Sequence, residues 1–406
     1  MRRISVTKIM PLHNIIHVEL IIIGAGVAGL CAAAFCVDNF LILERNNEAG
    51  KKLLLCGSGQ CNITHTGKIS DFLPQYGNNK KSRFVKPALF SFDNIAVCRF
   101  FAGRGVPVYQ REDGKIFPNS MQSREVRNSL AIPVKEKILT NSAVKNITKI
   151  QDKFLIETES STFSSTKLLI TTGGCSYPST GSKGDGFKFA QSLGHTIITP
   201  QPALAPIIVQ DFKFADSAGT TFSRTQIEIF RNEKCIHCST GDVLFTHRGL
   251  SGPGILDLSR YVKPLDQIRI PIIDAKSATE IFIGKKTVKN ILVNSGIPPR
   301  FVIQLLRELG VPPDLPASET PRKIRKQLTS ISFTVEKTAG WNEAMTTAGG
   351  IAIDEVNRYT MESRIIPNLF FAGEILDVDG NCGGYNIQFA LASGKLAANS
   401  IKKPPT

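Results

Sequence analysis

Three glycines near the N-terminus have the spacing of a phosphate-binding turn. Gly24, Gly26 and Gly29 form a G-x-G-x-x-G motif directly after the apolar run 18–23. In a strand–turn–helix unit the first glycine permits the bend, the second lets the backbone approach a pyrophosphate, and the third allows close packing of helix on strand. Glu44 ends a second apolar run 20 residues after Gly24, where a carboxylate can accept hydrogen bonds from an adenosine ribose. The sequence therefore predicts a dinucleotide site, which favours FAD or NAD over NADP.

A second candidate site lies near the other end of the chain. The apolar run 368–372 leads into Gly373 and Glu374, so a carboxylate follows a buried strand, where it can bind a ribityl hydroxyl. A helix is predicted over 388–399, and its positive N-terminal end would stabilise the anionic edge of a reduced flavin. FAD explains both ends of the chain, whereas NAD alone does not require the C-terminal motif. The residues expected to contact FAD here are Gly373, Glu374, Gly383, Gly384, Tyr385, Asn386 and Ile387.

Further FAD contacts are expected between these two motifs. The segment 50–65 is too rich in glycine for a helix and too polar at its end for a buried strand, so it predicts a loop over the cofactor, with Lys52 and Asn62 as contacts. Thr172 and Gly173 follow the apolar run 167–171, where flavoproteins of the two-dinucleotide type return the chain beneath the cofactor.

Two residue types offer acid–base chemistry. Cys61 and Cys382 both lie in glycine-rich or polar loops beside expected flavin contacts, and we favour Cys61 as the proton donor. His247 is the second catalytic candidate; the alternative is a histidine that only completes local hydrogen bonds. The sequence Cys-Ile-His-Cys at 235–238 resembles half a zinc site, but no second pair follows at metal spacing, so no metal is expected.

These motifs imply an interrupted α/β domain. After Pro200 the pattern changes to alternating strands punctuated by proline, then to helices, and the glycine-rich strand style returns at Thr346. The expected organisation is an N-terminal extension over 1–17, a discontinuous FAD-binding domain over 18–200 and 346–406, an inserted β-rich module over 201–274 and 331–345, and an inserted helical module over 275–330.

Composition restricts the class of protein. The chain has 406 residues, a formal net charge of +15 and nine cysteines. An odd number of cysteines in a chain of this length favours reduced thiols and a cytoplasmic location. The apolar run 20–37 is long enough to raise the alternative of a membrane span, but the glycine spacing and Glu44 argue against it.

The positive charge is concentrated in the predicted helical insertion. Eleven Lys or Arg face five Asp or Glu between Lys276 and Lys337, with dense runs at 285–289 and 322–326. Each run alone is typical of a solvated helix face, and together they indicate a candidate nucleic-acid surface.

The motifs together resemble the YhiN/BaiN-like NAD(P)/FAD-dependent oxidoreductases, from Ile21 to about Ala398. The resemblance implies a Rossmann-like FAD domain of the glutathione-reductase type, with inserted β-barrel-like and helical modules. One departure is Gln60, where the family has an arginine before the Cys-Asn pair. The matching segments are 24–30, 50–54, 61–64, 172–186, 194–195, 202–204, 245–253, 360–363 and 372–388.

The resemblance also implies an activity. We expect NAD(P)H to reduce FAD and a hydride to pass to an acceptor, with uridine of 23S ribosomal RNA, reduced to dihydrouridine, favoured by the basic insertion. The alternatives are a small-molecule reductase or oxidase acting on an enone or an amine, and an RNA-binding flavoprotein without turnover. The oligomeric state is left open.

Overall fold

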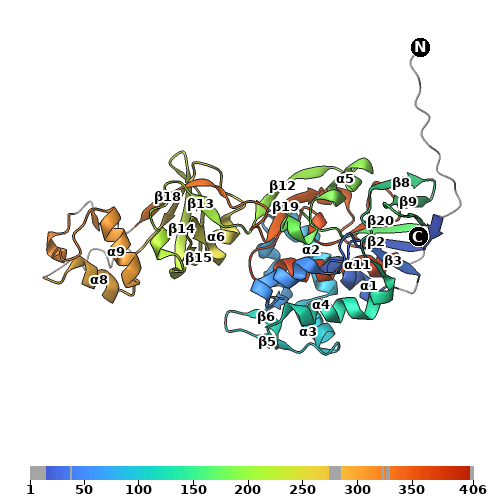
Figure 1. Ribbon diagram of the computed structural model, residues 1–406, viewed down its shortest axis with the longest axis horizontal. Coiled ribbons are helices and arrows are strands. Elements are labelled where there is room, and N and C mark those ends of the chain that lie inside the picture. Colours follow the sequence, from blue (N-terminus) through green and yellow to red (C-terminus); the bar gives the residue numbers. More distant parts are fainter. Residues whose placement is uncertain are drawn as a thin grey trace, which may run out of the picture. The chain divides into compact units, whose positions relative to one another are not determined.

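The computed structural model describes residues 15–36, 39–273, 285–321, 324–325, 327 and 330–402 (Figure 1). Two compact units divide the chain: unit 1 comprises Met1–Pro200 and Gly349–Thr406, and unit 2 comprises Gln201–Ala348. Separate hydrophobic cores lie in the two units. Unit 1 is therefore assembled from two stretches that unit 2 separates in the sequence.

A five-stranded parallel sheet forms the centre of unit 1, in the order β20-β11-β2-β3-β7. The middle strand, β2, is buried along its whole length, as expected for an apolar strand of a parallel sheet covered on both faces. Its Ile21 is in register with Leu168 of β11 and Leu41 of β3. The strands are β2 (Leu20–Ile23), β3 (Phe40–Leu43), β7 (Ile138–Leu139), β11 (Lys167–Ile170) and β20 (Leu369–Phe371).

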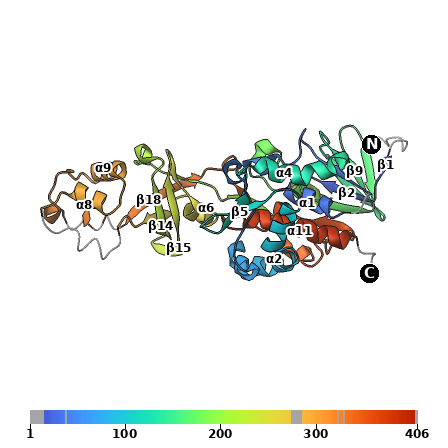
Figure 2. The ribbon, with the colours of Figure 1, turned by 90° about the horizontal axis from the view of Figure 1, so that it is seen from below.

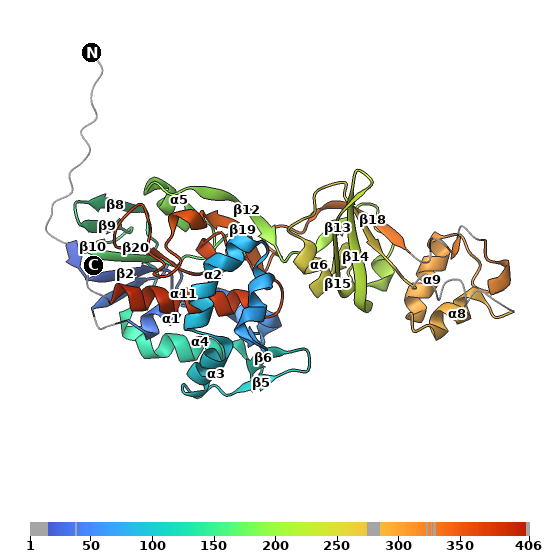
Figure 3. The same cartoon turned by 180° about the vertical axis from the view of Figure 1, so that it is seen from behind.

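Helices α1 and α11 lie side by side in unit 1, and α11 also packs against α2 (Figures 2 and 3). The close approach needs small residues: a Cβ on Gly394 of α11 would lie 2.4 Å from the carbonyl oxygen of Ala28 in α1. The helices of unit 1 are α1 (Val27–Ala34), α2 (Asn79–Ser91), α3 (Asn94–Ala102), α4 (Ser123–Ala131), α5 (Asp185–Ser192) and α11 (Tyr385–Ile401).

A separate two-stranded sheet pairs β12 (Ile197–Ala203) with β19 (Thr346–Ile351). Two further small sheets complete unit 1. One has the order β1-β10-β9-β8, the other β4-β6-β5. The sequence predicts a loose extension over 1–17, but Ile15–His17 form β1, because they add to β10 in parallel register. The strands of these two small sheets are β1 (Ile15–His17), β8 (Asn146–Ile150), β9 (Lys153–Glu157), β10 (Thr162–Ser165), β4 (Thr64–His65), β5 (Val108–Gln110) and β6 (Lys115–Pro118).

Unit 2 contains a closed antiparallel barrel in the order β13-β16-β15-β14-β17-β18. This barrel corresponds to the alternating strands that the sequence predicts after Pro200. The strands are β13 (Ile207–Val209), β14 (Thr221–Arg231), β15 (Lys234–Phe245), β16 (Gly249–Ser251), β17 (Gln267–Ile270) and β18 (Ile331–Thr338).

The helical segment of unit 2 shares a core with the barrel. Phe301 of α9 lies with its ring centroid 4.9 Å from that of Phe245 in β15 and 5.2 Å from that of Phe214. The two inserted modules that the sequence predicts are therefore joined by one continuous apolar cluster. The helices are α6 (Pro253–Leu258), α8 (Val288–Asn294) and α9 (Pro299–Glu308).

The predicted α/β class with a Rossmann-like sheet and an inserted barrel is confirmed. Within the part of the chain that the structure describes, no helix combines the length and the apolar character needed to cross a membrane. The apolar run 20–36 is instead a buried strand, a glycine turn and a helix.

Candidate functional site

The turn after β2 has the geometry of a phosphate-binding loop. Gly24 has φ +101°, and a Cβ there would lie 2.8 Å from the carbonyl oxygen of Thr171. A Cβ on Gly29 would lie 2.1 Å from the carbonyl oxygen of Gly24. Gly26, the N-cap of α1, is different, because its Cβ would meet only the Thr171 oxygen, at 4.0 Å. The outer glycines are thus required by packing, whereas Gly26 leaves space in front of the helix N-terminus.

Glu44 is fixed beside this turn. Its buried carboxylate accepts hydrogen bonds from the backbone N–H of Ala25 (2.8 Å) and from both the backbone N–H and the side-chain amide of Asn46 (2.8 and 2.7 Å). A carboxylate offers about four lone-pair positions, so three donors leave one acceptor position for a ligand. The arrangement holds the carboxylate at the end of β3, next to the glycine turn.

Lys52, Ser176 and Glu374 form a polar cluster from three distant segments. The Lys52 ammonium lies 2.5 Å from Ser176 Oγ and 2.5 Å from Glu374 Oε2, and the Ser176 hydroxyl donates to Glu374 Oε1 at 2.9 Å. The ion pair is partly exposed, with a quarter of the Lys52 side chain and a fifth of the Glu374 side chain accessible. Ser176 is the member that sequence reasoning missed, although it follows directly on the Thr-Gly-Gly-Cys segment.

The N-terminus of α11 is tied to the loop that carries Cys61. The Asn62 amide is satisfied when its oxygen accepts from Gly384 N–H (3.0 Å) and its nitrogen donates to the Thr64 carbonyl (2.8 Å). The Thr64 hydroxyl donates to Gln388 Oε1 in the first turn of the helix, at 2.7 Å. Because Gly384 is the N-cap of α11 and has no side chain, the helix begins beside this loop without a side chain of its own over its first amides.

Cys61 is fully buried and has the left-handed φ of 62°. The neighbouring Cys56 thiol, and then burial, raise the pKa of Cys61 well above its ordinary value. The interaction between the two thiols lowers the pKa of Cys56, and Lys52 also contributes to that lowering. At neutral pH Cys61 is therefore a protonated thiol.

The other predicted FAD contacts have mixed surroundings. Gly173, Gly373 and Gly383 have left-handed φ values of 71°, 78° and 135°. The Tyr385 ring stacks on His65 with centroids 5.6 Å apart, so it packs inside an aromatic cluster. The Asn386 side chain makes two hydrogen bonds to the backbone of Gly380, and Ile387 is half-buried in α11. The hydroxyl of Thr172 is buried and has no hydrogen-bond partner among the described residues.

The two predicted catalytic residues belong to different units. Cys61 lies in unit 1, whereas His247 is exposed in the turn between β15 and β16 of unit 2. The basic run 285–289 begins α8, with Lys285 and Lys286 exposed. The run 322–326 falls mostly outside the described residues; of its cations only Arg325 is described, and it donates to the Thr320 carbonyl at 3.0 Å.

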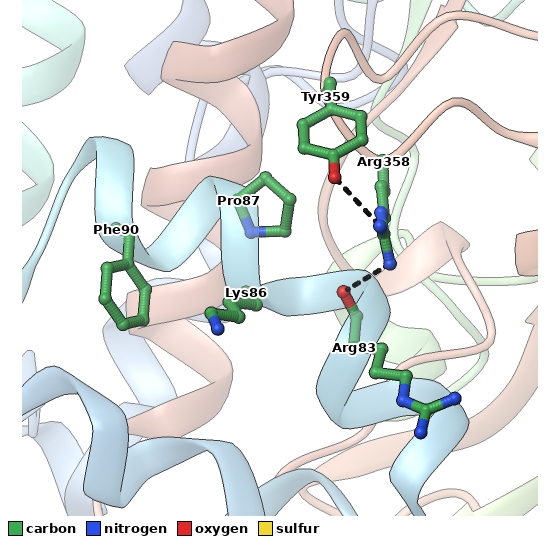
Figure 4. Close-up of a pocket in the computed structure, with 6 residues that line it drawn as sticks. All are labelled: Arg83, Lys86, Pro87, Phe90, Arg358 and Tyr359. Carbon is green, nitrogen blue, oxygen red and sulfur yellow. Dashed lines mark hydrogen bonds between the residues drawn. The ribbon is translucent and has the colours of Figure 1, made fainter.

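A cationic groove with aromatic walls lies on unit 1 and was not expected from the sequence (Figure 4). Phe90 and Tyr359 are 51% and 59% exposed. Arg358 donates to the Tyr359 hydroxyl at 2.8 Å and to the Arg83 carbonyl at 3.5 Å. Side chains of this kind bind anions and stack on planar rings. The groove is lined by four residues of α2 and two of the loop before β20: Arg83, Lys86, Pro87, Phe90, Arg358 and Tyr359.

These features together define a Rossmann-like FAD-binding fold: a glycine turn after the central parallel strand, a carboxylate at the end of the next strand, and a C-terminal helix beside α1. The chain belongs to the family described as HI0933-like protein Rossmann domain, whose model matches residues 18–400. The predicted family, the FAD cofactor and the oxidoreductase class are thereby confirmed.

Curated relatives match along nearly the whole chain. A ribosomal RNA dihydrouridine synthase of Haemophilus influenzae is 30% identical, over 95% of this chain and 98% of its own. A 3-dehydro-bile acid delta(4,6)-reductase of Clostridium scindens is also 30% identical, over 95% of this chain and 99% of its own. Among solved structures, the quinol fumarate reductase of Escherichia coli is similar in fold, with a TM-score of 0.51, 13% identity, and coverage of 96% of this chain and 70% of that one.

Proposed function

We propose that this flavoenzyme reduces a uridine of ribosomal RNA to dihydrouridine, with NAD(P)H as the reductant. Relatives of equal similarity act on ribosomal RNA and on a bile acid, so the relatives alone do not choose between them. The observation that carries the choice is the groove of Figure 4, where three cations stand beside two exposed rings. RNA offers phosphates to the cations and bases to the rings, whereas a bile acid needs an enclosed apolar pocket.

The residues of unit 1 fit FAD. The space in front of Gly26 and the N-terminus of α1 suit a pyrophosphate, and the remaining acceptor position of Glu44 suits a ribose hydroxyl. The Lys52–Glu374 pair supplies polar contacts for the rest of the cofactor, as does the Thr172 hydroxyl, which has no hydrogen-bond partner in the described part of the chain. When bound and reduced, FAD supplies a hydride.

Cys61 completes the reduction in this proposal. Uracil accepts a hydride at C6, and a proton must then reach C5 for the double bond to become saturated. The Cys61 thiol keeps its proton at neutral pH, and Asn62 holds its loop against the N-terminus of α11. The same helix end would stabilise negative charge on a flavin bound beside it. A base in folded RNA must also leave its stack to reach such a site.

The remaining expectations belong to the same proposal. NAD(P)H reduces the flavin directly, His247 contacts the substrate, and the basic surface of unit 2 around Lys285 and Lys286 adds phosphate contacts to those of the groove. A cytoplasmic location follows from a ribosomal RNA substrate.

The test compares ribosomal RNA from a deletion strain, from the same strain carrying the wild-type gene, and from a strain carrying Cys61→Ser. Nucleoside mass spectrometry should find less dihydrouridine in the deletion strain, with recovery only on wild-type complementation. Unchanged dihydrouridine in the deletion strain would overturn the proposal. In that case, oxidation of NAD(P)H by the purified protein in the presence of steroid enones would favour the small-molecule alternative.

A further inference from the structure

Two cysteines meet in the loop of the candidate site. The backbone N–H of Cys61 donates to the carbonyl oxygen of Cys56 at 2.9 Å, which closes the loop between them. The Cys56 thiol points toward the carbonyl oxygen of Asn62, the residue after Cys61, at 4.0 Å. The two thiols lie close enough for each to shift the pKa of the other. The residues between them turn through left-handed conformations, with φ of 56° at Gly57, 56° at Ser58 and 88° at Gly59. A covalent bond between the two sulfurs would therefore link groups that the backbone already holds together.

The two thiols differ in access and in acidity. Cys56 is half-buried between Leu55 and Ser58, which are exposed, whereas Cys61 is fully buried. The pKa of Cys56 is lowered, first by the neighbouring Cys61 thiol and to a smaller extent by the Asn62 backbone and the charge of Lys52, while burial opposes the shift. The thiolate is the form that attacks a disulfide. The less buried cysteine of the pair, Cys56, is thus the one suited to attack, and the fully buried Cys61 is the one placed to react with it afterwards.

We propose that Cys56 and Cys61 form a redox-active dithiol, which small disulfides of the glutathione class oxidise to an internal disulfide. In the first step the Cys56 thiolate attacks one sulfur of the small disulfide, forming a mixed disulfide and releasing one thiolate, which takes up a proton. In the second step the Cys61 sulfur, losing its proton, attacks Cys56 Sγ and releases the second small thiol. The two cysteines lose two electrons and two protons in total, and the small disulfide gains them.

Oxidation has a consequence that rests on the proposed function. A disulfide leaves Cys61 without the proton that the uracil C5 requires. The oxidised enzyme should therefore bind RNA as before but form dihydrouridine about a hundredfold more slowly, the usual contribution of a general acid. A dithiol reductant should restore the rate.

The first experiment follows the bond itself. The purified holoenzyme is incubated with glutathione disulfide, quenched with iodoacetamide and digested with trypsin. One tryptic peptide, residues 53–68, contains both cysteines and no internal Lys or Arg before its end. It should lose about 2 Da and resist alkylation until it is reduced. Full alkylation of both cysteines at every glutathione potential would overturn the proposal, as would a disulfide from either one to another cysteine.

Variants separate the two steps. Cys61→Ser should trap the mixed disulfide on Cys56 and gain about 305 Da, because the second sulfur is absent. Cys56→Ser should gain little, because Cys61 is buried. Cys98→Ser, which removes a half-buried thiol elsewhere in unit 1, should behave as the wild type. Equal glutathionylation of the Cys61→Ser and Cys56→Ser proteins would contradict the proposed order.

The outcomes also distinguish this inference from the proposed function. If the disulfide forms and the oxidised enzyme still makes dihydrouridine at the full rate, the redox pair stands and Cys61 is not the proton donor. If the peptide never loses its two hydrogens while the enzyme modifies RNA, the redox pair fails and the proposed function stands.

Discussion

Cys61 is the residue on which the proposed chemistry depends. Its burial keeps the thiol protonated, and its left-handed backbone is held by the hydrogen bond to the Cys56 carbonyl and by the neighbouring Asn62–Gly384 contact. Strained backbone of this kind persists where the surrounding structure over-determines it. The loop that carries Cys61 is thus fixed at the N-terminus of α11.

We expect Cys61→Ser to lower the rate of dihydrouridine formation by about 10²- to 10⁴-fold, because a serine hydroxyl is a much weaker acid than a thiol. Flavin content and reduction of the flavin by NAD(P)H should stay near wild type, since hydride transfer from the nicotinamide does not use this proton. Single-turnover kinetics with RNA and anaerobic flavin absorbance measure the two steps separately. The matched control is Cys98→Ser, and a full single-turnover rate in Cys61→Ser would exclude the thiol as the acid.

At the scale of elements, the unit of β2, its glycine turn and α1 explains why three glycines have two different roles. Gly29 faces the Gly24 carbonyl at a distance no side chain can enter, whereas the position of a Cβ on Gly26 is open. Packing of this strand–turn–helix unit requires Gly24 and Gly29, whereas we expect the bound ligand to require Gly26.

A pair of alanine substitutions tests this difference. Gly29→Ala should destabilise unit 1 by about 1–3 kcal/mol even without cofactor, because the new methyl overlaps backbone. Gly26→Ala should leave the unfolding temperature of the apoprotein almost unchanged and weaken FAD binding about tenfold or more, because the methyl occupies the place of the pyrophosphate. Thermal unfolding of apoprotein and FAD titration measure both effects. If the Gly26→Ala protein binds FAD as tightly as the wild type, the pyrophosphate does not bind at this turn.

The exposed face of α2 is the second element with a testable role. Arg83 and Lys86 of this helix line the groove together with Arg358 and Tyr359. On the other side of the same helix, Lys81 pairs with Asp377 and Asp379, in the segment that follows Glu374. Helix α2 therefore contacts the segment that follows Glu374 on one side and lines the groove on the other.

The double variant Arg83→Ala/Lys86→Ala should bind ribosomal RNA fragments more weakly at low salt. The slope of log affinity against log salt should fall by about 0.7 for each lost phosphate contact with single-stranded RNA. Fluorescence anisotropy at several salt concentrations gives both quantities. Lys145→Glu, at an exposed lysine that pairs with Glu159, is the control for charge alone. An unchanged slope in the double variant would move the RNA contacts away from this groove.

At the scale of the whole molecule, unit 1 is joined from two stretches on either side of unit 2. His195, near the end of the first stretch, lies with its Nε2 2.9 Å from Ser363 Oγ and its ring 4.8 Å from Phe371 of β20. Burial lowers the pKa of this histidine, while the nearby Glu355 opposes the shift.

The lowered pKa predicts a loss of stability in mild acid. In the unfolded chain the pKa of a histidine is about 6.5. Below that pH the unfolded state takes up a proton that the folded state resists, so the free energy of unfolding falls as pH falls toward the folded pKa. Denaturant unfolding at pH 7.5 and 5.5 should show a smaller difference for His195→Asn than for the wild type. An equal difference in both proteins would assign the acid sensitivity to other groups.

The sequence by itself determined the features that depend on neighbours in the chain. The glycine turn, the acid at Glu44, the strand leading to Gly373 and the helix after Gly384 are local patterns, because each follows from side-chain periodicity and the conformational freedom of glycine. The α/β class, an inserted β-rich module and the FAD cofactor could therefore be predicted, and the resemblance to a known family added that the module is barrel-like. The strand Ile15–His17 could not, because three residues become a strand only through the partner that they add to.

Only the tertiary structure decided which distant residues meet. The cluster of Lys52, Ser176 and Glu374 joins three segments, and the groove joins α2 to a loop more than 260 residues later. The continuous core of barrel and helices in unit 2 has the same origin. Such contacts depend on how sheets and helices pack, and a single sequence contains no local pattern that records them.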